Sequence, residues 1–246
     1  MKRKRLDRDA WGFQYFPYYQ MRVETEHFKG LVALICMTFD HLGKEIFPDS
    51  LWMQVIGRFA LPIFSYMIAE GCYYTKNKGK YLGTVAFVAL LCQVVYFVAE
   101  KSMYQCILVT FSLSILLIYT IDYVKKKQNI ISVLIFAIVF LGVYYLCNVL
   151  PQKFLAYGFF IDYGLFGVLL PVFIYMGGTK YEKIAMTVLG LTLLAANSGG
   201  IQWYSLFSVL LLLLYNGQRG RLKLKYLFYI YYPLHLVLIY GLSLVI

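Results

Sequence analysis

The amino-acid sequence predicts an all-α protein, a polytopic membrane helix bundle of about nine transmembrane spans, with eight to ten as the range. Of its 246 residues, 61% are hydrophobic and 14% are charged, whereas about 25% are charged in ordinary soluble domains. The mean hydropathy is +0.67. A soluble globule of this size needs a charged surface, so a bilayer must replace water around much of this chain.

Residues 1–27 form a basic and aromatic N-terminal tail ahead of the first long apolar run. The charges are scattered through it, so we expect no cleavable signal peptide. Its aromatic patch from Trp11 to Tyr19 follows a basic cluster and suits the membrane interface, although a loosely ordered tail is an equal alternative. Residues 28–246 are expected to form a single transmembrane domain.

Apolar runs near the roughly 20 residues that cross a bilayer recur along the rest of the chain, separated by charged residues, Gly or Pro. The seventh and eighth runs are separated only by residues 197–200 and are expected to be short or tilted. The predicted spans are 28–47, 51–71, 81–99, 104–124, 130–150, 159–176, 182–197, 200–216 and 226–245.

The distribution of Lys and Arg predicts the orientation, because cytoplasmic loops accumulate these residues. Most of the 23 basic residues lie in the tail and in every second loop, while Lys44, Lys101 and Lys153 lie on the opposite face and Arg58 lies within a span. The N-terminus is therefore predicted to be cytoplasmic. Loops that face anionic lipid or an anionic cytosolic ligand explain the net charge of +11 without nucleic acid. The five cysteines show no metal-ligand spacing, so neither a disulfide framework nor a metal site is predicted.

Ionisable side chains inside the predicted spans are the candidate functional residues, because burying them in lipid is costly. His41 lies about 20 Å along the first span, and Arg58 lies at a similar depth in the second. The loop between these spans is short, so they are expected to be antiparallel neighbours that share one cavity. Asp40 points about 100° away from His41 and is expected to pair with Arg58 or another helix. An inert boundary histidine and a snorkelling arginine are the alternatives.

His235 lies in the middle of the last predicted span, where a position at the membrane boundary cannot explain it. It follows Pro233, whose missing N–H frees a backbone carbonyl, and tyrosines surround it. A hydrogen-bonded histidine in the bundle core is the alternative. Glu70, Asp122 and Asp162 lie near span ends, where a solvated or loop-capping role is expected. These residues leave three classes open: proton-coupled transport, acyl transfer across the bilayer and a membrane scaffold.

Two segments resemble one known family. They are DHLGKEIFPDSLWMQVIGRFALPIFSYMIAEGCYYTKNKGKY, from Asp40, and KYLFYIYYPLHL, from Lys225. Both are similar to signatures of the TraX family, whose founding type acetylates the N-terminus of conjugative pilin. A more distant similarity is to membrane acetyltransferases of bacterial envelope glycans and lysosomal heparan sulfate.

The resemblance implies an acyltransferase of the bacterial inner (plasma) membrane that uses cytoplasmic acetyl-CoA as co-substrate and needs no bound cofactor or metal. It assigns His41 as catalytic base and places Asp40 and Arg58 in the catalytic site. His235, Tyr231 and Glu70 are assigned to the substrate or acyl tunnel. The acceptor is expected to be a pilin-like protein N-terminus or an envelope glycan or lipid.

Basic side chains on the cytoplasmic face are expected to bind the phosphates of CoA, because Lys and Arg form charge-assisted hydrogen bonds. From there the pantetheine arm must reach roughly 20 Å to His41. A transporter or flippase is an alternative, although no internal repeat is found, and so is a non-catalytic membrane assembly protein. The expected CoA-binding residues are Lys76, Lys78, Lys80, Arg219 and Arg221.

Overall fold

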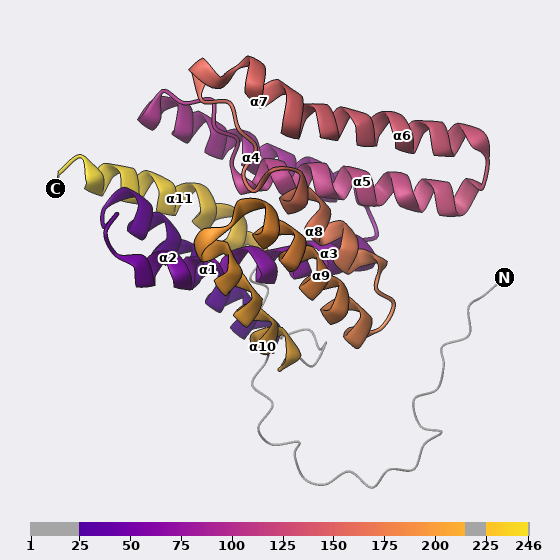
Figure 1. Cartoon of the computed structure of the whole chain (residues 1–246), viewed down its shortest axis with the longest axis horizontal. Helices are drawn as coiled ribbons and strands as arrows, with labels where there is room; N and C mark the ends of the chain where they lie inside the picture. The colour runs from indigo at the N-terminus through magenta and orange to yellow at the C-terminus, as the bar shows by residue number, and fades with distance from the viewer. Residues whose placement is uncertain (1–24, 215–224, 246) are drawn as a thin grey trace, which may run out of the picture.

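The computed structural model describes residues 25–214 and 225–245, and it is almost wholly helical over them (Figure 1). The prediction of an all-α protein is therefore confirmed for these residues. The helices are α1 Thr25–Glu45, α2 Leu51–Gly57, α3 Ala60–Tyr74, α4 Lys78–Glu100, α5 Ile107–Lys127, α6 Ile130–Tyr144, α7 Leu150–Lys153, α8 Gly164–Met176, α9 Lys180–Ser198, α10 Ser208–Leu213 and α11 Lys225–Ser243. A π-helical segment, Tyr145–Val149, joins α6 to α7, and two 3-10 segments cover Leu155–Tyr157 and Gly200–Phe207.

Four helical segments in the described part of the chain are long and apolar enough to cross a membrane, which supports the assignment as a membrane protein. They are Leu51–Tyr74, Lys78–Glu100, Ile107–Lys127 and Ile130–Lys153, and two shorter apolar helices cover Gly164–Met176 and Gly200–Leu213. The helices follow one another in the order of the nine predicted spans. The count of nine crossings and the cytoplasmic N-terminus stay predictions.

The second predicted span is not one continuous helix. It breaks between α2 and α3 at Arg58 and Phe59, four residues before Pro62. Proline has no N–H to donate to the carbonyl of residue i−4, and its ring clashes with that carbonyl. Because of Pro62, the Arg58 carbonyl accepts no i to i+4 helical hydrogen bond. The break between the two helices therefore falls at Arg58, one of the candidate site residues predicted from the sequence.

Side-chain caps or glycines define several of the other helix ends. The Asn77 side chain accepts a hydrogen bond from the Lys80 N–H at the start of α4, and Thr179 and Glu182 form a capping box at the start of α9. Between α9 and the segment Gly200–Phe207, Gly199 and Gly200 both have positive φ, which glycine adopts at little cost. At the eighth predicted span the described residues contain a shorter apolar helical segment, Gly200–Leu213, whereas α9, at the seventh, extends over 19 residues.

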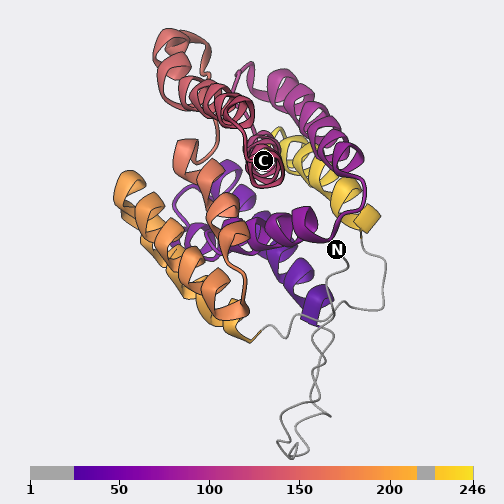
Figure 2. The ribbon, with the colours of Figure 1, turned by 90° about the vertical axis from the view of Figure 1, so that its right-hand side faces the viewer.

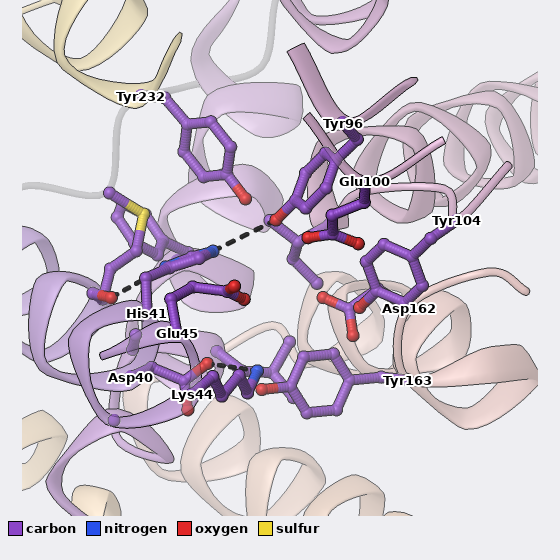
Figure 3. Close-up of a pocket in the computed structure, with 16 residues that line it drawn as sticks. Asp40, His41, Lys44, Glu45, Tyr96, Glu100, Tyr104, Asp162, Tyr163 and Tyr232 are labelled. Atoms are coloured by element: carbon purple, nitrogen blue, oxygen red, sulfur yellow. Dashed lines mark hydrogen bonds and ion pairs between the residues drawn. The ribbon is translucent and has the colours of Figure 1, made fainter. Parts of the chain in front are cut away.

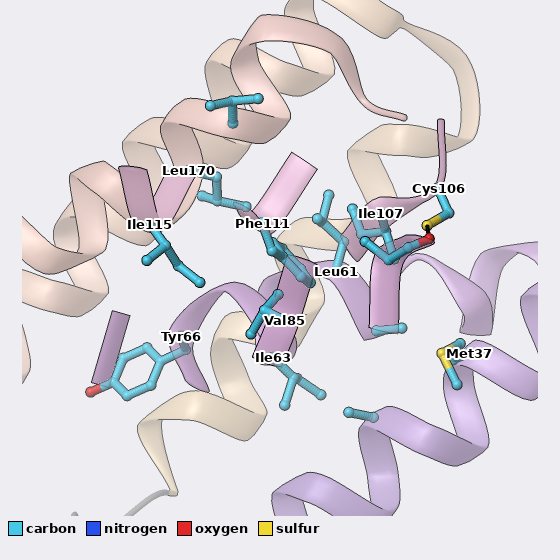
Figure 4. Close-up of a cluster of buried hydrophobic side chains, with 14 of the residues drawn as sticks. Met37, Leu61, Ile63, Tyr66, Val85, Cys106, Ile107, Phe111, Ile115 and Leu170 are labelled. Atoms are coloured by element: carbon cyan, nitrogen blue, oxygen red, sulfur yellow. Dashed lines mark hydrogen bonds between the residues drawn. The ribbon is translucent and has the colours of Figure 1, made fainter. Parts of the chain in front are cut away.

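The hydrophobic core lies between α3, α5 and α8, and α6 and α7 lie at the edge of the molecule (Figures 1 and 2). Phe111, Ile115 and Leu170 are fully buried within this core (Figure 4). On α6, by contrast, Ile130 and Ile138 are about 70% exposed. A polar solvent would not tolerate so apolar a helix surface, but lipid solvates it at no cost.

Candidate functional site

A cavity of about 290 Å³ lies at one end of the bundle, where α1 and α4 end and where α5 and α8 begin (Figure 3). We call it the His41 pocket. Its walls carry an unusual number of polar side chains for a membrane bundle, and buried polar groups at such a position mark a candidate functional site. The polar lining residues are Asp40, His41, Lys44, Glu45, Tyr96, Glu100, Tyr104, Asp162, Tyr163 and Tyr232.

The hydrogen bonds of His41 assign its tautomer. Its Nδ1 lies 2.9 Å from the Met37 carbonyl oxygen, which can only accept, so Nδ1 of the neutral ring carries the proton. Nε2 then holds a lone pair, and it lies 3.2 Å from the Tyr96 hydroxyl, which donates to it (Figure 3). The imidazole is therefore oriented with an unprotonated nitrogen turned toward the pocket.

His235 contacts His41 from α11. Its Nδ1 lies 3.0 Å from the Tyr231 carbonyl, so the same reasoning leaves its Nε2 unprotonated, at 3.4 Å from His41 Nδ1. Tyr231 stacks on the His235 ring with 5.3 Å between centroids, and its hydroxyl lies 2.7 Å from the Thr38 hydroxyl. The structure thus places the two histidines together, with His235 as a second acceptor for the His41 N–H.

Asp40, which directly precedes His41 in the sequence, forms ion pairs with two basic side chains. Its Oδ2 accepts from Lys44 Nζ at 2.5 Å, and its Oδ1 lies 3.9 Å from an Arg58 nitrogen. The Arg58 pairing expected from the sequence is present, but Lys44 is the nearer partner. Asp40 is only 6% exposed, and its buried Oδ1 accepts no hydrogen bond from the described residues.

Arg58 acts on the pocket through Tyr163. The guanidinium donates to the Tyr163 hydroxyl at 3.3 Å, and the lining of the pocket includes Tyr163 but not Arg58. Tyr163, which precedes α8, has a φ of 59°, an uncommon conformation for a residue with a side chain and one that clusters at functional sites. Burial raises the pKa of Tyr163 to about 12, so the hydroxyl stays protonated and can donate into the pocket.

Gly57 sets the distance between α1 and α2. A Cβ built at this position would lie 2.5 Å from Asp40 Cβ and 2.6 Å from Asp40 Oδ1. Any side chain there would push Asp40 away, because real Cβ atoms do not approach so closely. The GRFALP segment therefore combines a glycine for the approach of the helices, an arginine for charge and a proline that breaks the helix.

Carboxylates outnumber cations around the pocket. Among the described residues, Asp40, Glu45, Glu100 and Asp162 line it together with a single lysine, Lys44. The Tyr240 hydroxyl donates to Glu100. Burial raises the pKa of the Asp162 carboxyl, which lies in the segment before α8. An excess of acidic groups makes the pocket attractive to a cationic ligand.

The remaining predicted site residues that the structure describes lie away from the His41 pocket. Glu70 lies 3.9 Å from Lys183 near the end of α3. Lys78 pairs with Asp122, which also accepts from the Tyr175 hydroxyl at 2.9 Å. Lys76 and Lys80 are exposed on either side of Lys78. Arg219 and Arg221 fall outside the described residues.

Several residues of the pocket were not predicted from the sequence. The charge pattern places Lys44 on the outer face and not among the site residues, but it lies in the last turn of α1 and pairs with Asp40. For Asp162 a solvated or loop-capping role is expected, yet it lines the pocket. The GRFALP spacing could have indicated Gly57. The chain has 24 tyrosines, and no local sequence pattern distinguishes those that line the pocket from the others. The others that sequence reasoning missed are Glu45, Tyr96, Glu100, Tyr104, Tyr163 and Tyr232.

Comparisons with known proteins give the same relationship as the two segments quoted above. A family model described as "TraX protein" matches residues 25–243. The chain is 24% identical over 243 residues to "Probable fimbrial assembly protein FimC, serogroup H1" of Dichelobacter nodosus, covering 85% of this chain and 91% of that protein. It is 38% identical over 47 residues to an uncharacterized protein of Rickettsia prowazekii (strain Madrid E), covering 19% of this chain and 18% of that protein. No solved structure shows a significant match.

Proposed function

The chain belongs to the TraX family, and from this premise we propose that it is an integral membrane acyltransferase that moves an acetyl group from coenzyme A to an acceptor across the membrane. The observation that carries the proposal is the state of His41. The residue is 9% exposed, its tautomer is held by a backbone carbonyl, and the lone pair of its Nε2 points into a polar pocket. A general base in acyl transfer needs that combination of position and protonation.

The reaction follows from these groups. His41 Nε2 takes a proton from the acceptor as the acceptor attacks the thioester carbonyl carbon. The tetrahedral intermediate collapses, the carbon–sulfur bond breaks, and the thiolate of coenzyme A receives the proton from His41. The His235 ring, beside the protonated Nδ1, keeps His41 in the reactive tautomer throughout. Proton transfer by a positioned histidine contributes about 10²–10⁴-fold to such reactions.

A hydrogen-bond donor is also needed for the oxyanion that develops on the carbonyl oxygen. Tyr163 and Lys44 both line the pocket. Tyr163 is the better candidate, because Lys44 is held by Asp40, whereas Arg58 donates to the Tyr163 oxygen and leaves its hydroxyl proton free to point into the pocket. In this mechanism Asp40 positions Lys44, and Arg58 positions and polarises the Tyr163 hydroxyl. His41 and Tyr163 contact the reacting atoms.

The acidic lining favours an amine as acceptor over a sugar hydroxyl. An ammonium group is attracted by Glu45, Glu100 and Asp162. It loses its first proton to water before the attack, and the second passes to His41 as the amine attacks. The relative from Dichelobacter nodosus is named for fimbrial assembly. Both points support a pilin-like protein N-terminus rather than an envelope glycan.

We propose that the acetyl donor, acetyl-CoA, binds at the membrane face opposite the one near the His41 pocket. The positive-inside pattern predicts that the loop with Lys76 and Lys80 is cytoplasmic, and both side chains are exposed and able to meet the phosphates of acetyl-CoA. Lys78 is a weaker candidate, because it already pairs with Asp122. A donor site on one face and an acceptor site toward the other require a protein that crosses the membrane, so we propose multi-pass insertion in the bacterial plasma membrane.

A non-catalytic role in pilus assembly is the second candidate, because the name of the same relative mentions assembly and no reaction. Mass spectrometry of surface proteins and envelope glycans separates the two roles. We expect cells without the gene to lose an acetyl group from the amino terminus of a surface protein, and cells with the His41→Ala variant to lose it as well. Normal acetylation of every surface component in both strains would support the assembly role and refute the enzyme.

A further inference from the structure

A second cavity, of about 270 Å³, lies beside the His41 pocket inside the same bundle. Its walls come from α1, α3, α4, α5 and α11 and are almost entirely hydrocarbon, with tyrosines as the exception. We call it the apolar cavity. Phe64 and Tyr232 line both cavities, so the two spaces adjoin at these side chains.

The order of lining residues along the helices shows that the cavities lie end to end. On α4, Val85 and Val88 line the apolar cavity and Tyr96 lines the His41 pocket. On α5 the order is reversed, because Ile107 lines the pocket and Phe111 lines the apolar cavity. Neighbouring antiparallel helices must show such a reversal if the cavities follow one another along the bundle axis. Figure 4 shows Val85 and Phe111 in the buried centre of the bundle.

The two cavities together extend from a basic loop to the reactive histidine. Tyr81, which lines the apolar cavity, directly follows Lys80. From Tyr81 to Tyr96 the rise along α4 is about 22 Å, and the Tyr96 hydroxyl contacts His41 Nε2. This length is comparable to that of the extended phosphopantetheine arm of coenzyme A.

We propose that the apolar cavity binds the pantetheine arm of an acyl-coenzyme A, an assignment that rests on the proposed function and gives it a donor site. The phosphates bind at the loop with Lys76 and Lys80, and the thioester arrives at His41. The methyl and methylene groups of the arm suit the hydrocarbon walls. The tyrosine hydroxyls supply the few polar partners that its two amides need, as in most small-molecule sites. They belong to Tyr81, Tyr229 and Tyr232.

Binding of two ligands by the purified protein in lipid nanodiscs tests the assignment. Adenosine 3′,5′-bisphosphate carries only the head of coenzyme A, whereas the S-ethyl thioether of coenzyme A carries the head and the arm and cannot react. Burying one methylene group contributes about 0.8 kcal/mol, or roughly fourfold in affinity. The wild-type protein should therefore bind the thioether at least tenfold more tightly than the bisphosphate.

Two tryptophan substitutions on α4 provide the comparison. Val88 is 5% exposed and lines the apolar cavity, whereas Val94 is 61% exposed on the same helix. Val88→Trp should abolish the advantage of the thioether and leave bisphosphate binding unchanged, which also shows that the variant is folded. Val94→Trp should bind both ligands as the wild type does. Equal thioether affinity in the two variants would overturn the assignment.

Photo-cross-linking of the wild-type protein gives an answer that depends on no substitution. A thioether of coenzyme A with a diazirine in its arm should label Val85, Val88 or Phe111. Labelling confined to outward-facing positions such as Val94 would refute the assignment, as would a lipid chain that occupies the cavity while the thioether binds elsewhere. If acetyl transfer proceeds despite such results, only the donor site is wrong. If the wild type neither binds the thioether nor transfers acetyl groups, the proposed function fails as well.

Discussion

Substitution of Gly57 by alanine tests whether the close contact of α1 and α2 positions the reactive groups. The added Cβ would lie 2.5 Å from Asp40 Cβ, and ordinary van der Waals contact begins at 3.4 Å. Asp40 or the helix that carries it must therefore move by about 1 Å. Overpacking of this kind costs about 1–3 kcal/mol of stability. A displacement of about 1 Å at a reactive site lowers the rate by about 10²-fold.

Thermal unfolding in detergent and the initial rate of acetyl transfer measure the two effects. Gly57→Ala should lower the melting temperature by several degrees and lower the rate about 10²-fold. Gly83→Ala is the matched control, since Gly83 lies within α4 and its Cβ would meet nothing within 4 Å. The control should retain its activity and gain about 0.5–1 kcal/mol from helix propensity. Equal stability and activity in the two variants would refute the reasoning.

Three further substitutions give separate tests. Tyr96→Phe removes the hydroxyl that donates to His41 but keeps the ring, so kcat should fall by roughly tenfold, equivalent to one net hydrogen bond, with little change in melting temperature. His235→Ala should lower kcat without changing the affinity for CoA, because the ring contacts His41; Leu238→Ala, at an exposed position of α11, should change neither quantity. Burial raises the pKa of the Asp162 carboxyl above its ordinary value of 3.8, so the folded protein binds this proton more tightly than the unfolded chain, and stability falls as pH rises above about 4. Asp162→Asn should flatten that slope in melting temperature measured against pH.

The sequence was sufficient to predict the helices and the meeting of Asp40 with Arg58. Hydropathy and charge determine where a chain can cross lipid, and a short loop between two apolar runs makes them neighbours. The break at Arg58 could also have been read from Pro62, four residues later, but the apolar run continues through it and masks the interruption. The family resemblance then favoured a catalytic base over an inert boundary histidine at His41.

The rest of the pocket was not predictable because it depends on contacts between distant segments. Tyr96 reaches His41 from 55 residues away, and the Tyr163 hydroxyl meets Arg58 across 105 residues. Nothing local separates these tyrosines from those that face lipid. The charge pattern placed Lys44 on the outer face because it treats a lysine near a span end as solvated. Its pairing with Asp40 needs only the i to i+4 spacing of one helix.

The proposal that His41 is the base of an acyltransferase is tested most directly with purified protein and radiolabelled acetyl-CoA. The initial rate of transfer to an amine-bearing peptide should fall by about 10²–10⁴-fold in His41→Ala. It should stay at the wild-type level in Ile35→Ala, an exposed position of the same helix. Transfer by the His41→Ala variant at the wild-type rate would contradict the proposal.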